Sequence, residues 1–199
     1  MNRARQFLAV AMVAVLCLAL PSEVRTQSTV PFVGMGDSIG EGVQSGDASA
    51  FTQGITFLNL MAWKMGANFP LPWIKTGPFA SVDSTSGRSR YDLSARSRNL
   101  SVSGADVTSI LTDAAAAFTP AQIDTETELV LFPETGSQIE IAERLHPQTV
   151  ACWIGNNDAL GAVLAYDQLN ATQLTPVPEF TARFTELVSR IDAMGSRAV

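Results

Sequence analysis

Short apolar segments alternate with stretches of helical spacing along most of this chain. The apolar segments are Thr29–Met35, Asn99–Val102, Leu129–Phe132 and Thr149–Ile154. The first, second and fourth are short runs that favour buried strands. Strands that alternate with helices are typical of an α/β domain with a parallel sheet. We therefore expect an α/β fold, with the functional residues in the loops that follow the strands.

The helical stretches are recognised by apolar residues spaced three or four apart. We expect helices over 51–67, 107–118, 139–145, 159–169 and 180–194. The last has the strongest amphipathic pattern, and a helix with so apolar a face needs a sheet to cover. Residues 68–97 show no period, and we expect this long irregular stretch to shape a binding pocket.

A further strand would normally follow the helix over 180–194. The segment Gly195–Val199 does not have the pattern of such a strand. The sequence therefore indicates a domain, 23–199, whose C-terminal part is missing. It also predicts an exposed apolar patch where the next element would pack.

The first 22 residues have the pattern of a secretory signal peptide. Arg3 and Arg5 provide a positive start, and Phe7–Leu20 is an uncharged run that is short for a membrane span. The alternative is an uncleaved N-terminal anchor. We expect a secreted or periplasmic protein with no stable membrane span after signal removal, in which Cys152 is left as a single buried thiol.

Net charge and histidine content limit the functions that this chain can have. The net charge of −6 argues against nonspecific nucleic-acid binding, which needs clustered basic residues. No pattern indicates a metal or an organic cofactor. The single histidine, His146, limits every mechanism that depends on an imidazole.

Three polar segments follow predicted strands, and catalytic groups are expected in these segments. They are Gly36–Gly42, Val102–Ala105 and Gly155–Asp158. Because ligands bind at the carboxyl ends of parallel strands, these segments should lie at one edge of the sheet. Together they offer the Ser38 hydroxyl, backbone N–H groups beside glycines, and the Asn157 amide, which is the set of groups used in acyl transfer with an oxyanion hole.

These three segments resemble the sequence blocks of the GDSL-type lipase/esterases of the SGNH hydrolase superfamily. Gly36-Asp37-Ser38 is similar to the first block, Gly104 to the glycine of the second, and Gly155-Asn156-Asn157-Asp158 to the third. The resemblance implies a flavodoxin-like three-layer α/β/α fold and ester hydrolysis without a cofactor. It implies that Ser38 is the nucleophile and that Ser38, Gly104 and Asn157 form the oxyanion hole, with Asp37, Gly155 and Asp158 in supporting roles.

The chain departs from the family in lacking the Asp-x-x-His block that would supply the general base. His146 precedes the third block, although Glu143 and His146 imitate the spacing. It is either a relocated base or a solvated histidine at a helix end. A serine without its base is a weak nucleophile, so we expect a nearly inactive chain, most simply a fragment of a longer esterase.

Plainer roles compete with the catalytic ones for several residues. The alternative role is a structural turn for Ser38 and a helix start for Gly104, while Asn157 and Asp158 suit a helix cap. Asp37 is expected to fix its turn. For the tryptophans, we expect Trp63 and Trp153 to pack in the core and Trp73 to be exposed.

Two functions are consistent with the sequence. One is an exported hydrolase of lipid, carbohydrate or aryl esters, and the other is a catalytically inactive extracellular binding module on the same fold. Phosphate binding by the glycine-rich segment is weaker, because the Gly-Lys of a phosphate-binding loop is absent.

Overall fold

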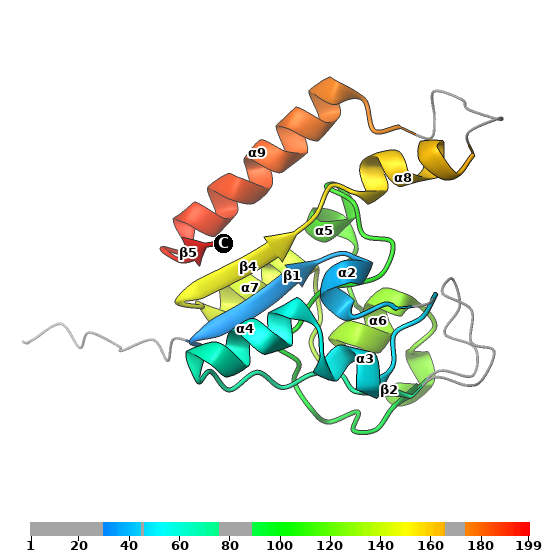
Figure 1. Cartoon of the computed structure of the whole chain (residues 1–199), viewed down its shortest axis with the longest axis vertical. Helices are drawn as coiled ribbons and strands as arrows, with labels where there is room; N and C mark the ends of the chain where they lie inside the picture. The colour runs from blue at the N-terminus through cyan, green and yellow to red at the C-terminus, as the bar shows by residue number, and fades with distance from the viewer. Residues whose placement is uncertain (1–29, 45, 76–88, 166–173) are drawn as a thin grey trace, which may run out of the picture.

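A parallel sheet forms the centre of the molecule. The structure, a computed structural model, describes residues 30–44, 46–75, 89–165 and 174–199. Strand β1 (Phe32–Gly36) pairs in parallel with β4 (Thr149–Trp153), and β4 pairs in parallel with β5 (Arg197–Ala198) (Figure 1). All five residues of β1 are buried, as expected for a strand covered on both faces.

Residues 98–102 extend this sheet on the other side of β1. The Gly34 N–H donates to the carbonyl of Arg98 (2.9 Å), and the N–H groups of Leu100 and Val102 donate to Gly34 (2.8 Å) and Gly36 (3.0 Å). The predicted strand over 99–102 is therefore present as a parallel segment with a single formal bridge. Across the sheet, the spatial order is residues 98–102, β1, β4 and β5. Numbered by their order in the chain, these four segments lie in the order 2-1-3-4, which matches the start of the flavodoxin-like order.

Helices cover both faces of the sheet, which gives three layers. On one face, Phe32 and Ala151 pack against Leu58 and Ala62 of α4 (Phe57–Met65). On the other, the neighbouring strand residues pack in the larger core formed with α5, α6, α7 and α9 (Figure 1). The α/β fold with a parallel sheet is as the sequence predicted.

The remaining helices and strands connect these layers. Their bounds are α2 (Ser38–Glu41), α3 (Ala50–Gly54), β2 (Ile74–Lys75), β3 (Ser89–Arg90), α5 (Ser109–Thr112), η1 (Pro120–Gln122), α6 (Glu126–Leu131), α7 (Gln138–Leu145), α8 (Asn157–Leu164) and α9 (Val177–Ala193). Helices α7 and α9 match the predicted stretches closely. Of the predicted helix over 159–169, residues 159–164 lie in α8.

Two predicted helices differ from the observed ones. The stretch 51–67 is divided into α3 and α4, because the Thr56 side chain caps a new helix by accepting from the Asn59 N–H (3.1 Å). The stretch 107–118 has helical geometry only over α5. Beyond it, Ala115 exchanges two backbone hydrogen bonds with Gly136 (3.0 and 2.8 Å), so long-range pairing overrides the helix propensity of the alanines.

The apolar run Leu129–Phe132, for which the sequence predicted neither a strand nor a helix, lies largely in helix α6, where Thr125 caps the start. The C-terminal end differs from expectation. The end of the chain does contain a strand, because the N–H groups of Arg197 and Val199 donate to Gln148 (2.9 Å) and Val150 (3.0 Å). The exposed apolar patch that the sequence predicts corresponds to a groove of about 430 Å³ beside β5, between β4 and α9.

The tryptophans do not follow the prediction. Trp63 is 78% exposed on the outer side of α4, and Trp153, the last residue of β4, is 49% exposed. Both were expected in the core, but Leu58 and Ala62 occupy the inner face of α4. Trp73 is exposed, as expected. Cys152 packs against the core, and burial raises the pKa of its thiol to about 12.

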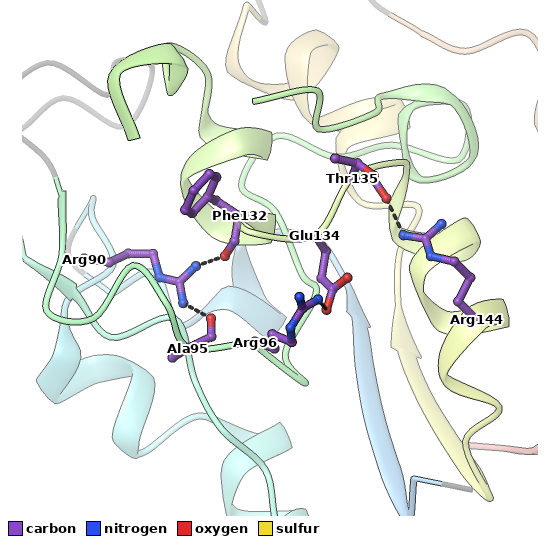
Figure 2. Close-up of polar contacts among 7 residues, drawn as sticks. All are labelled: Arg90, Ala95, Arg96, Phe132, Glu134, Thr135 and Arg144. Atoms are coloured by element: carbon purple, nitrogen blue, oxygen red, sulfur yellow. Dashed lines mark hydrogen bonds and ion pairs between the residues drawn. The ribbon is translucent and has the colours of Figure 1, made fainter. Parts of the chain in front are cut away.

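The buried Arg90 holds part of the irregular stretch in place. Its guanidinium donates to the carbonyls of Ala95 and Phe132 (Figure 2). It also donates to the carbonyl of Pro72 (2.9 Å). Burial lowers the pKa of this group to about 10. Nearby, Arg96 pairs with Glu134 at 2.7 Å. The described part of 68–97 is therefore anchored to the connection that follows α6.

No helix among the described residues is long and apolar enough to cross a membrane. The predicted signal peptide, 1–22, lies outside the described residues and stays a prediction.

Candidate functional site

The three polar segments singled out from the sequence lie at one edge of the sheet. They follow β1, the 98–102 segment and β4, which are neighbours and run in the same direction. The Asp37 N–H donates to the carbonyl of Trp153 (3.0 Å), so the first and third segments are joined directly. Helices α2 and α8 both begin at this edge (Figure 1).

Ser38 is the first residue of the short helix α2. The Asp37 side chain caps this helix by accepting from the Ile39 N–H (2.9 Å), and Gly42 ends it with a φ of 108°. Ser38 is half-buried. Within the described ranges, its hydroxyl makes no hydrogen bond and therefore has no base in contact.

Asp37 is fully buried beneath this turn. Its second carboxyl oxygen accepts from the Asn156 amide (3.3 Å). Desolvation raises the pKa of Asp37 above its ordinary value, while the hydrogen bonds from Ile39 and Asn156 oppose the shift. Its contacts are those of a residue that fixes the Ser38 turn.

The Gly104 loop is attached to the Ser38 helix through Glu41. The N–H and hydroxyl of Ser103 both donate to one carboxylate oxygen of Glu41, at 2.6 and 2.5 Å. Glu41 itself is fully buried. Gly104 has a φ of 83°, and an added Cβ would meet no atom within 4 Å. The backbone conformation, and not a lack of space, therefore favours glycine here.

Asn157 and Asp158 connect α8 to the segment that follows Gly104. The Asn157 amide donates to the Ala105 carbonyl (2.7 Å), and the Asp158 carboxylate accepts from the Val107 N–H (3.1 Å). Neither side chain caps α8, so the capping alternative is not what the structure contains. The Asn157 amide keeps a second hydrogen that Ala105 does not use.

Two glycines shape the turns at this edge. Gly155 has a φ of 107° and leads β4 into α8. Gly36 has a φ of 136°, and an added Cβ would lie 2.0 Å from the Trp153 carbonyl oxygen. The buried Gln138 side chain accepts from the Gly36 N–H (2.9 Å) and donates to its carbonyl (3.0 Å). The backbone just before Ser38 is therefore held firmly.

A hollow of about 330 Å³ opens beside Ser38. Its polar lining consists of Asp37, Ser38, Asn156 and Asn157, and its apolar lining of Ile39, Ala159, Leu160 and Val163. Gly104 does not line it. Gly104 borders a second hollow of about 260 Å³, which also contains Ser103 and Asp106. The structure thus brings Ser38 and Asn157 into one hollow and leaves Gly104 at the next.

His146 lies far from this edge. It ends α7 with a φ of 45°, three residues before β4 begins. The five residues of β4 span about 16 Å at about 3.3 Å per residue, and Ser38 lies beyond the opposite end of the sheet. Glu143, the expected partner of His146, instead pairs with Arg190 at 2.7 and 2.6 Å. This placement favours the helix-end interpretation of His146.

Sequence reasoning missed two residues that position this edge, Glu41 and Gln138. Glu41 lies within the motif that contains Ser38, and a carboxylate among glycines was a usable signal. Gln138 lies 102 residues from Gly36, and no local pattern links the two.

The described residues hold no group of three or more His, Cys, Asp or Glu side chains arranged to bind a metal. Comparison of the chain with family models, with curated proteins and with solved structures finds no match.

Proposed function

We propose that this protein is an exported serine ester hydrolase of the GDSL type, with Ser38 as its nucleophile. One observation supports this most: Ser38 and Asn157 line the same hollow at the carboxyl edge of a parallel sheet. The family resemblance of the three sequence blocks adds to it. The export rests on the predicted signal peptide alone.

The proposed reaction is acyl transfer through Ser38. The serine oxygen forms a bond to the acyl carbon and gives up its proton, and the bond to the alcohol oxygen breaks as that oxygen takes a proton. Water then hydrolyses the acyl-serine, which releases the acid and restores the hydroxyl. The second amide hydrogen of Asn157 and the N–H group of Ser38 would stabilise the oxyanion. Gly104, which the resemblance also assigns to the oxyanion hole, borders the next hollow.

The proposal predicts a slow reaction. The only histidine of the sequence lies at the other end of the sheet, and Asp37 is engaged in holding the turn. A serine without its general base is a weak nucleophile, so we expect slow hydrolysis through Ser38.

Hydrolysis of p-nitrophenyl butyrate by the full chain tests the proposal. We expect Ser38→Ala to reduce the rate to background and Asn157→Ala to reduce it by about 10²-fold. Asn156→Ala is the matched control, because this amide contacts Asp37 and should affect the rate less. A folded Ser38→Ala variant with an unchanged rate would contradict the proposal.

The second candidate is a binding module without catalysis. It is favoured by the absence of any base in contact with the Ser38 hydroxyl among the described residues. This alternative predicts ligand binding that Ser38→Ala leaves unchanged, together with no hydrolysis by any folded form of the chain.

A further inference from the structure

The hollow beside Ser38 has one polar and one apolar side. Its polar side contains Ser38 and Asn157, the groups proposed to hold an ester carbonyl. The apolar side is made by Ile39 of α2 and by Leu160 and Val163 of α8. These two helices begin at the same edge, so the apolar surface starts directly next to the proposed reaction centre.

The apolar side chains of this surface are exposed. Ile39 is 49% exposed, Leu160 41% and Val163 67%. Helix α8 packs on the protein through Asp158 and Ala162, which are buried. Leu160 and Val163 therefore face away from the core, and an apolar ligand in the hollow would remove their surface from water.

The lining argues for an alkyl chain over a sugar. Beyond the polar side, the described lining side chains are Ile39, Ala159, Leu160 and Val163, none of which donates or accepts a hydrogen bond, so the hydroxyl groups of a sugar would lose their partners against them. Among the described residues, no aromatic ring and no Lys or Arg lines the hollow, so these residues offer neither ring stacking nor a cationic side chain to a ligand. Its volume is at the low end of the range for small-molecule sites.

We propose that this hollow binds the acyl chain of the substrate, which makes the preferred substrates esters of fatty acids and not acetylated sugars. The proposal rests on the function proposed above. The carbonyl lies between Ser38 and Asn157, and the alkyl chain extends along Ile39, Leu160 and Val163.

Binding of methyl ketones to the full chain tests this without catalysis. The series butanone, hexanone, octanone and decanone carries a carbonyl and a growing alkyl chain but has no ester bond. We expect the Kd, measured by NMR titration, to fall about twofold to fourfold per added methylene until the hollow is full. The amide signals of Ile39, Leu160 and Val163 should shift most.

Two matched variants locate the binding. Val163→Asp places a charge in this hollow, and Val188→Asp places one in the larger apolar groove between β4 and α9. Both valines are exposed on helices, at 67% and 48%. Val163→Asp should abolish the dependence on chain length, and Val188→Asp should leave it unchanged. The amide spectrum of each variant verifies that it is folded.

The outcomes separate this proposal from the proposed function. Loss of the dependence in Val188→Asp but not in Val163→Asp, or no dependence in the unmodified chain, overturns the acyl site even if Ser38 hydrolyses esters. Retention of the dependence in Ser38→Ala supports the acyl site, because binding of the alkyl chain does not need the nucleophile. That support holds even if no ester is hydrolysed.

Discussion

Glu41 is the residue through which the Ser38 helix holds the Gly104 loop. One of its carboxylate oxygens accepts two hydrogen bonds from Ser103, and the side chain is fully buried. Hydrogen bonds to a charged group are stronger than neutral ones, and losing one in a buried site is costly.

We expect Glu41→Gln to lower the free energy of unfolding by about 1.5–3 kcal/mol. Ser103→Ala, which removes only the hydroxyl donor, should cost less. Urea denaturation of both variants and of the double variant measures the coupling between them. Additive effects would show that the Glu41–Ser103 contact contributes nothing specific.

Asp37 gives the stability of the protein a particular dependence on pH. Its pKa in the folded state is raised above the ordinary value of 3.8, chiefly by burial. The stability linked to its neutral form is present below that ordinary value and is lost as the pH rises through the raised folded pKa.

Asp37→Asn should remove this dependence and keep the helix cap, because Asn and Asp cap helices about equally well. We expect the unfolding free energy of the unmodified chain, minus that of the variant, to fall as the pH rises from 3.8 upward. Chemical denaturation at a series of pH values measures it. A difference that grows with pH would contradict the assignment.

At the scale of elements, the junction of β1, β4 and α2 depends on Gly36. A side chain there would meet the Trp153 carbonyl and would require an unfavourable φ. We expect Gly36→Ala to destabilise the fold by about 3 kcal/mol or more. Gly54→Ala is the matched control, since its Cβ would only touch the Trp73 ring at 3.7 Å.

Thermal unfolding of the two glycine variants measures the difference. Equal stabilities would mean that the junction tolerates movement and does not fix the position of Ser38.

At the scale of the whole molecule, the elements with a clear local pattern were predictable. Strands β1 and β4 were expected from the apolar runs Thr29–Met35 and Thr149–Ile154, and helices α7 and α9 from apolar residues three or four apart over 139–145 and 180–194. The helix predicted through Ala115 was wrong, because pairing with Gly136 decides the conformation there. Tertiary contacts of this kind leave no signal in the local sequence.

The candidate site was predictable in the same limited sense. The position of Ser38 and Asn157 at one edge follows from parallel strands and their order. The contacts that hold the edge, from Glu41 to Ser103 and from Gln138 to Gly36, join residues that are 62 and 102 positions apart. The hollow proposed to bind the acyl chain likewise requires α2 and α8 to meet, which no single stretch of sequence specifies.

The central claim is that Ser38 is a nucleophile, and covalent labelling tests it most directly. The full chain would be treated with a fluorescent fluorophosphonate and the modified peptide located by mass spectrometry, with Ser38→Ala and His146→Ala as controls. We predict one slow modification, at Ser38, that is absent in Ser38→Ala and unchanged in His146→Ala. A folded chain that stays unmodified, or is labelled at another residue, would contradict the claim.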